Sequence, residues 1–401
     1  MKSIVLGYPR IGGKRELKKA IEKYWKNEIS EAQLSSISKN IRKQNWNTQN
    51  NLGVDLISSN DFSLYDQVLD TCITFECIPK RFKNLTGLQQ YFVMARGIQK
   101  ENMDVTAMEM TKWFNTNYHY IVPEFSKDQS FSLNPGKIIN EYKEAQELGI
   151  KTKPVIIGPV TFLLLGKEKE NGFHRLNLLD KLLPEYEKLI RILDRLGLEY
   201  LQIDEPILAT DLDTNGQEAI KRSYEHFKNL NTNVKFILAN YFDCYGDNLD
   251  VALQLPVQVL HLDLVHCHKQ LEDILSHPLL DSSKTLSLGL VDGRNIWKND
   301  FKKSLQTIEK AKEKLSIENI WIGTSCSLLH APFDLDFETK LNPEIKQWLA
   351  FAKQKVDEVV TLKILASTEN NSVALEKLKA NQLAIKSRKV SKLIHNNITV
   401  R

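Results

Sequence analysis

The first helix that the sequence predicts begins with an unusual number of cations. Lys14, Arg15, Lys18 and Lys19 follow the pair Gly12-Gly13, after a short apolar run. Free N–H groups and the helix dipole make a helix N-terminus partly positive, so cations are mildly unfavourable there. A bound anion would reverse that effect, because the N–H groups and the basic side chains would then all face negative charge. The run predicts an anion-binding helix start; a solvated basic face is the alternative.

A second group of side chains lies between Glu109 and Tyr120. It places Lys112 and Asn117 among aromatic residues. A lysine in such surroundings could hold a carboxylate beside a flat ring system. The alternative is ordinary packing, since aromatic clusters more often fill cores.

Carboxylates and hydroxyls follow several apolar runs. Asp204 and Glu205 end one run just before Pro206, and 291–295 and 325–327 stand in similar positions. Barrel enzymes keep their active sites at the carboxyl ends of their strands. Structural caps and loop ion pairs are the alternative, so the role of Asp204 and Glu205 stays open.

The stretch from His261 to His268 contains residue types that bind zinc. Its members are His261, Asp263, His266, Cys267 and His268. Side chains alternate between the two faces of a strand, and no partner cluster with ligand spacing follows. The sequence therefore predicts no metal site in this chain.

Short apolar runs alternate with amphipathic helical stretches along the chain. Several runs lack any polar alternation, which is typical of parallel strands covered on both faces. The predicted strands are 4–6, 54–57, 154–157, 200–203, 234–238, 259–264, 285–290 and 320–322, with a weaker candidate at 109–114. This alternation predicts an α/β fold of the (β/α)8 TIM-barrel type, with extra helices in 14–50 and 61–105. A doubly wound open sheet is the alternative, but no G-x-G-x-x-G motif supports it.

Charge and cysteine content exclude some classes of protein. The net charge of +4 comes from the end of the chain, where 377–401 holds seven Lys or Arg and no Asp or Glu. The remainder is slightly acidic, which argues against nucleic-acid binding. The five cysteines show no paired framework, and the N-terminal apolar run is too short for a signal peptide or membrane span. We expect a cytoplasmic protein with a barrel at 1–366 and a basic linker at 367–401.

Nine segments, in order, resemble one family. They read GYPRIGGKRELKKA, NDFSLYDQVLD, AMEMTKWFNTNYHYIVPEFS, NEYKEAQELGI, PVIIGPVTFLLLGK, QIDEPIL, LGLVDGRNIWKNDF, GTSCSLLHAPFDL and ETKLNPEIKQWLAFAKQKVDEV. Together they are similar to the N-terminal half of the cobalamin-independent methionine synthases, also called 5-methyltetrahydropteroyltriglutamate–homocysteine methyltransferases. The resemblance runs from residue 4 to about 360.

The resemblance implies two fused (β/α)8 barrels and a reaction without cobalamin. The second barrel, which would be this chain's partner, holds zinc and homocysteine in the family, and 5-methyltetrahydropteroyltri-L-glutamate lies between the barrels. The implied contacts to the folate and its carboxylate tail are Arg15, Glu16, Leu17, Lys18 and Lys112, with Asn117 beside them. The zinc ligands and catalytic residues would lie in the second barrel, which implies that this half alone is inactive.

Two other functions remain open from the sequence. One is a non-catalytic module that binds folate polyglutamates or docks on a separately encoded catalytic half. The other is a zinc-free barrel enzyme similar to uroporphyrinogen decarboxylase.

Within this half, 237–241 offers neither His nor Cys where the family's zinc pair would fall, and Cys326 alone makes no site.

Overall fold

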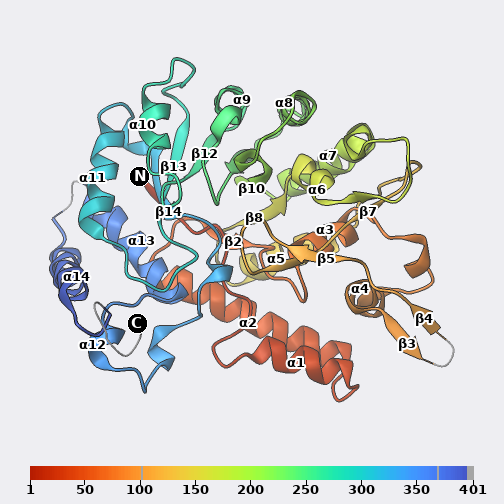
Figure 1. Ribbon diagram of the computed structural model, residues 1–401, viewed down its shortest axis with the longest axis horizontal. Coiled ribbons are helices and arrows are strands. Elements are labelled where there is room, and N and C mark those ends of the chain that lie inside the picture. The colour runs from red at the N-terminus through yellow and green to blue at the C-terminus, as the bar shows by residue number, and fades with distance from the viewer. Residues whose placement is uncertain (101–102, 368–369, 395–401) are drawn as a thin grey trace.

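Eight parallel strands form a barrel in the computed structural model, which describes residues 1–100, 103–367 and 370–394 (Figure 1). In chain order the strands are β1 (Lys2–Ile4), β2 (Ile57–Ser59), β8 (Thr152–Ile157), β10 (Tyr200–Asp204), β11 (Lys235–Ala239), β12 (Val259–Asp263), β13 (Thr285–Val291) and β14 (Ile320–Thr324). Each pairs with its neighbour in the chain, and β1 pairs with β14. A single bridge between Ile4 and Leu56 joins β1 to β2. The predicted barrel class is confirmed.

Helices follow each strand and cover the outside of the barrel. They are α5 (Gly136–Glu147), α6 (Pro159–Leu165), α7 (Leu179–Arg195), α8 (Thr214–Lys228), α9 (Leu249–Gln254), α10 (Gln270–Leu275), α11 (Phe301–Lys312), the short α12 (Pro343–Lys346) and α13 (Ala352–Ala366). The extra helices expected in the first hundred residues are α1 (Glu16–Trp25), α2 (Glu31–Leu52), α3 (Gln67–Thr74) and α4 (Gly87–Arg96). In Figure 1, α1 and α2 extend away from the barrel as a pair.

The ninth strand candidate, 109–114, is not part of the barrel. Met110–Lys112 forms β5, which pairs antiparallel with β6 (His119–Ile121). This hairpin lies in the long connection between β2 and β8. Two further small pairings are β3 (Ile98–Lys100) with β4 (Met103–Val105), and β7 (Glu124–Phe125) with β9 (Lys167–Glu168).

The barrel interior is polar where a packed TIM barrel usually holds branched apolar side chains. Lys153 of β8 is buried and donates to Ser58 Oγ at 2.8 Å and to Gln202 Oε1. Gln202 in turn donates to Asp204 Oδ1 at 2.7 Å, and Tyr241 donates to Asp204 Oδ2 at 2.9 Å. Burial raises the pKa of Asp204 to about 6 and lowers that of Lys153 to about 7. The network satisfies charges that would otherwise be costly to bury.

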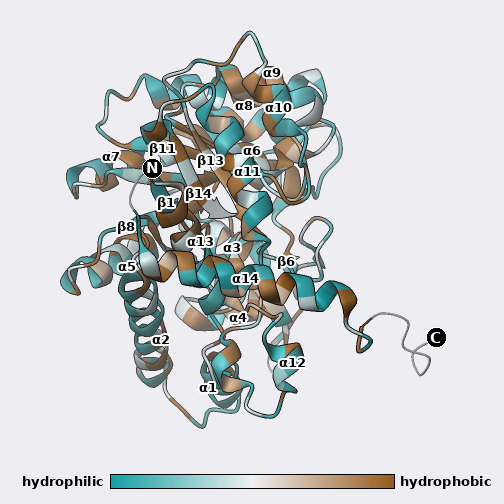
Figure 2. Ribbon diagram, turned by 90° about the vertical axis from the view of Figure 1, so that its left-hand side faces the viewer, coloured by the Kyte–Doolittle hydropathy of each residue, from teal (hydrophilic) through white to brown (hydrophobic). Residues whose placement is uncertain are grey.

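The expected linker needs a correction. Residues Ser372–Val390 form helix α14, which contacts α11 and α13 and buries Ala374, Asn381 and Ile385 (Figure 2). Asn381 accepts from the backbone N–H of Phe301 and donates to the carbonyl of Asn299, which ties the helix to the barrel. The sequence pattern missed it because polar and basic residues occur all round the helix. The domain boundary near 366 stays a prediction.

The expected absence of paired cysteines is wrong for one pair. Cys244 and Cys267 form a disulfide between the loops after β11 and β12. No sequence pattern revealed it, because 23 positions separate the two residues and only the barrel brings the loops together. Throughout the part of the chain that the structure describes, no helix is long and apolar enough to cross a membrane.

Glu358 on α13 provides a test of pH-dependent stability. One carboxylate oxygen accepts from Asn299 N–H at 3.0 Å, and the other has no partner among the described residues. Burial raises its pKa to about 7 from 4.5, so the protonated form is favoured in the folded state. Its stabilising contribution is complete below pH 4.5 and is lost as the pH rises to 7, a loss of up to about 3 kcal/mol.

We therefore expect Glu358→Gln to be more stable than the unaltered protein at pH 8 and to lose that advantage at pH 5. Urea unfolding at both pH values measures it, with Glu376→Gln on the exposed side of α14 as the control. An equal difference at both pH values would contradict the assigned role.

Candidate functional site

A cavity of about 500 Å³ opens at the carboxyl ends of β1, β2 and β14. Its size suits a ligand of drug-like dimensions. The walls come from the loop after β1, one face of α1, the β5–β6 hairpin and the loop after β14. The lining side chains are mostly apolar or aromatic, with Arg10, Lys18, Glu22 and His119 as the basic and acidic members. This is the face on which barrel enzymes build their sites.

The start of α1 shapes the lower wall of this cavity. Arg15 precedes the helix with φ 61°, in the left-handed region, and its side chain is exposed. Glu16 turns back and accepts from Lys14 N–H at 2.8 Å, beneath Gly12. Leu17 is buried against the core, whereas Lys18 stays largely exposed, 3.8 Å from Glu22. Of these four predicted residues, Leu17 and Lys18 line the cavity.

The β5–β6 hairpin supplies the opposite wall. Met110, Tyr118 and His119 line the cavity, and Lys112 pairs with His119 across the hairpin. Lys112 and Asn117 are both exposed and do not reach the lining themselves. Alternation along β5 puts Lys112 on the same side as Met110, whose side chain is 54% exposed at the cavity. The predicted lysines of α1 and of β5 therefore border one cavity from two sides.

Arg10 is a lining residue that the motif analysis did not single out. Its guanidinium donates to Ser63 O and, at 3.4 Å, to Tyr118 Oη, and lies 5.9 Å from the Tyr118 ring centre. Its position directly after the first strand was the available signal, since that is where barrel loops place functional side chains. Tyr118, Trp25 and Phe333 add aromatic faces to the same cavity.

Beside the cavity, Phe242 forms the centre of an aromatic wall. Its ring centre lies 6.0 Å from that of Phe114 and 5.7 Å from that of His330, and the Arg294 guanidinium lies 5.0 Å above it. Phe242 has φ 82°, a conformation that a bulky residue rarely adopts. Burial lowers the pKa of His330 to about 4, so this ring is neutral at physiological pH.

Arg294 joins the loop after β13 to the hairpin. Its two terminal nitrogens donate to the side-chain and main-chain oxygens of Asn115 at 2.9 and 3.0 Å. We expect Arg294→Ala to free the hairpin tip, with amide exchange over 113–118 faster by roughly fivefold, since such bonds contribute about 1 kcal/mol. Hydrogen-exchange mass spectrometry measures it.

Arg294→Lys is the control, because lysine keeps the charge but lacks the paired geometry of a guanidinium. It should recover only part of the protection. Unchanged exchange in Arg294→Ala would show that the hairpin is held by its own packing.

The two carboxylates that end β10 have structural partners. Asp204 belongs to the interior network described above. Glu205 accepts from the N–H groups of Val160 and Thr161 at 3.3 and 2.7 Å, at the start of α6. A Cβ on Gly158 would lie 2.1 Å from the Glu205 carboxyl carbon, so glycine is required for this approach. These contacts favour the capping interpretation for Glu205.

The His261–His268 stretch does not gather into a metal site. His261 points into the barrel, between Ser287 Oγ at 2.9 Å and the Ser325 carbonyl at 3.1 Å. His266 contacts Asp263 at 2.8 Å, and His268 contacts the Leu264 carbonyl at 2.6 Å. Among the described residues, the one cluster of three metal-binding side chains is Asp243, Cys244 and Cys267, where both sulfurs are already joined to each other.

The residues at the two positions compared with a zinc site in the sequence analysis do not fit zinc. Cys326 is buried, and its sulfur lies against Ser325 Oγ and Ser327 O. Burial raises the pKa of its thiol well above the usual value, whereas zinc binds the thiolate. Asn240, at the end of β11, provides an amide instead of an imidazole or thiol.

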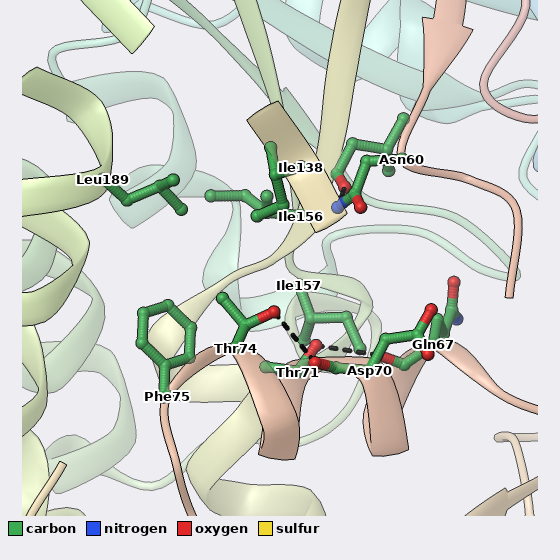
Figure 3. Close-up of a pocket in the computed structure, with 11 residues that line it drawn as sticks. Asn60, Gln67, Asp70, Thr71, Thr74, Phe75, Ile138, Ile156, Ile157 and Leu189 are labelled. Carbon is green, nitrogen blue, oxygen red and sulfur yellow. Dashed lines mark hydrogen bonds between the residues drawn. The ribbon is translucent and has the colours of Figure 1, made fainter. Parts of the chain in front are cut away.

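Two other hollows differ from this cavity in size or in position. The one drawn in Figure 3 lies between α3, α5 and β8, beside Asp70 and Thr74, and at about 20 Å³ it has room for one water molecule. A hollow of about 770 Å³ lies at the amino ends of the strands, among Tyr200, Lys235 and Thr285. That end of a barrel usually serves stability instead of catalysis.

Comparison with known proteins identifies the family. Residues 2–316 match the model of the N-terminal domain of the cobalamin-independent synthases. The chain belongs to this family. Two relatives are the 5-methyltetrahydropteroyltriglutamate–homocysteine methyltransferases of Flavobacterium johnsoniae, 55% identical, and Saccharomyces cerevisiae, 46% identical. Each match covers 99% of this chain and 52% of the relative, so the chain spans about half the length of these synthases.

Solved structures support the fold. A putative vitamin-B12-independent methionine synthase from Listeria monocytogenes superposes with a TM-score of 0.61 at 15% identity, covering 92% of this chain and 98% of that one. A B12-independent methionine synthase from a Shewanella species gives 0.58 at 12% identity, covering 88% and 92%. At these identities the likeness concerns the barrel architecture.

Proposed function

We propose that this chain is the folate-binding half of a cobalamin-independent methionine synthase, a methyltransferase that moves a methyl group from 5-methyltetrahydropteroyltri-L-glutamate to homocysteine. The proposal rests on one observation: aromatic and cationic side chains both line the cavity at the carboxyl face. Trp25, Tyr118 and Phe333 offer faces for a flat pterin, and Arg10 and Lys18 offer charge for carboxylates.

The triglutamate tail explains the crowded cations of α1. Lys18 lines the cavity and Lys112 stands on the opposite wall, while Arg15 begins the helix. A chain of carboxylates between them would satisfy the basic side chains and the positive end of the helix together. Glu16 and Leu17 then serve to shape this helix start, and Asn117 lies at the tip of the hairpin.

Activation of the homocysteine thiol is assigned to the second half of the enzyme. In this half the strand ends offer Asn240 and a buried Cys326 thiol, neither of which suits a zinc-bound thiolate. We therefore propose that this chain positions the methyl donor and that methionine forms only when it docks on the second barrel. Its own residues bind and orient the folate.

Ligand-induced protection tests the binding site. Titration with 5-methyltetrahydropteroyltriglutamate, followed by hydrogen-exchange mass spectrometry, should slow exchange in 9–25, 110–119 and 329–333. Protection elsewhere, or none at saturating ligand, would contradict the assignment. Mixing the chain with the second half of the Flavobacterium johnsoniae relative and measuring methionine separates an enzyme half from a non-catalytic binding module.

A further inference from the structure

Two loops at the carboxyl face of the barrel are joined by the Cys244–Cys267 disulfide, with Cα atoms 5.2 Å apart. Cys244 lies in the loop after β11, and Cys267 lies in the loop after β12. We propose that this pair is a reversible thiol–disulfide modification site that fixes the loop carrying Phe242.

The first argument is the solvent exposure of the cysteines. Cys244 is partly exposed, and Cys267 is 7% exposed. The three other cysteines, Cys72, Cys77 and Cys326, are fully buried thiols. A soluble oxidant can therefore reach Cys244 while the remaining thiols stay protected, and reactivity of a thiol follows its exposure and thiolate character.

The second argument is that the two loops do not depend on the disulfide. Asp263, at the end of β12, accepts from Phe242 N–H at 2.9 Å across the loops. The same carboxylate accepts from Val265 and His266 N–H at 3.0 Å. Tyr245 donates to the His261 carbonyl at 3.0 Å. These contacts hold the sulfurs close when the bond is open, so both the dithiol and the disulfide are compatible with the folded barrel.

The chemistry balances with a peroxide as oxidant. The Cys244 thiolate attacks one peroxide oxygen, the O–O bond breaks, and the leaving hydroxide takes a proton to become water. Cys267 then attacks the Cys244 sulfur, the S–O bond breaks, and a second water forms with the Cys267 proton. Two electrons pass from the two thiols to the peroxide, and an external dithiol reverses the change by exchange.

Closing the disulfide affects the aromatic wall around Phe242. Phe242 lies two residues before Cys244, and its ring contacts Phe114, His330 and the Arg294 guanidinium. Closing the disulfide shortens the free loop on one side of Phe242, so its turn has fewer conformations to explore. This inference does not depend on the ligand of the neighbouring cavity.

Peptide mapping tests the site in the whole chain. Protein prepared with dithiothreitol is treated with hydrogen peroxide, and free thiols are blocked with N-ethylmaleimide. We expect a Cys244–Cys267 peptide pair in most molecules, loss of that pair on renewed reduction, and alkylation of Cys72, Cys77 and Cys326 only after unfolding. Oxidation should slow amide exchange in 241–246 and 264–268.

Cys267→Ser is the matched variant, because Cys244 should then stop at sulfenic acid and exchange should not slow. Cys244→Ser should leave Cys267 unreactive in the folded protein. Cys244 oxidised without pairing in the unaltered chain, a disulfide that dithiothreitol cannot open in the folded state, or unchanged exchange on closure would each overturn the proposal.

Discussion

The double variant Lys18→Ala, Lys112→Ala should bind 5-methyltetrahydropteroyltriglutamate roughly tenfold more weakly, while binding of the monoglutamate changes by no more than about twofold. Lys18 lines the cavity and Lys112 borders it from the hairpin. Each contact to a tail carboxylate is partly exposed, so we assign about 0.7 kcal/mol to each, and the sum of about 1.4 kcal/mol corresponds to a factor of ten. Isothermal titration calorimetry at low and at physiological salt measures both ligands.

The control is Lys14→Ala, Lys19→Ala, which removes two exposed cations from the same helix start without touching the cavity lining. The control variant should weaken the binding of both ligands only slightly. Equal losses for the triglutamate and the monoglutamate in the first variant would show that the lysines do not hold the tail. If the control variant lost as much affinity as the first, the effect would be one of net charge.

The second large effect is on stability. Lys153→Ala should lower the free energy of unfolding by about 3–5 kcal/mol, because removing one member of a buried charge network leaves the others uncompensated. The variant leaves Asp204 inside the barrel without a cation and removes the hydrogen bonds to Ser58 and Gln202. Urea unfolding followed by circular dichroism measures the change.

The pH dependence gives this prediction a definite form. Burial raises the pKa of Asp204 to about 6 and lowers that of Lys153 to about 7. Because the folded state favours the neutral lysine, the contribution of Lys153 to stability is smallest below pH 7 and grows as the pH rises towards 10.5, so the loss in Lys153→Ala should increase between pH 6 and pH 9. Asp204 acts in the same direction, because removing the cation raises its pKa further and the variant then loses stability above pH 6.

Lys151→Ala is the matched control, since Lys151 is exposed two residues earlier. It should change stability by less than about 0.5 kcal/mol. In the double variant Lys153→Ala, Asp204→Ala, the loss should be smaller than the sum of the two single losses, because each partner's removal relieves the other. Simple additivity would show that the two groups do not interact.

Strand positions were predictable because their signal is local. Most of the eight barrel strands are buried on both faces and contain an apolar run, and the structure has a strand at or beside each predicted run. The start of β1 and β2 differed by two or three residues from the predicted runs, since the barrel bonds of Ile4 and Ile57 depend on neighbours far along the chain. Helix α14 was missed because, apart from Ile385, its buried positions are small or polar residues.

Site residues could be predicted only where residues adjacent in the sequence line the same side of the cavity. Leu17 and Lys18 come from one helix turn, and the importance of the hairpin followed from its aromatic residues. Arg294 lies in 291–295, a candidate segment because it follows an apolar run, whereas Arg10 and Phe333 come from separate loops, and no pattern in the chain relates them. The Cys244–Cys267 pair was hidden for the same reason. Folding creates these relations, so they require coordinates.

The pairing of β1 with β14 has a consequence for biosynthesis. Lys2 lies beside Trp321, and Ile4 lies beside Gly323, so β1 can complete its pairing only after a segment that is synthesised much later. Until about residue 324 has left the ribosome, β1 is held on its β2 side alone, by the bridge from Ile4 to Leu56 and by the hydrogen bonds of Ser3 to Asp55. During that interval the edges of β1 and of the growing sheet are free to pair wrongly, which makes this stage the one at which chaperones would matter most.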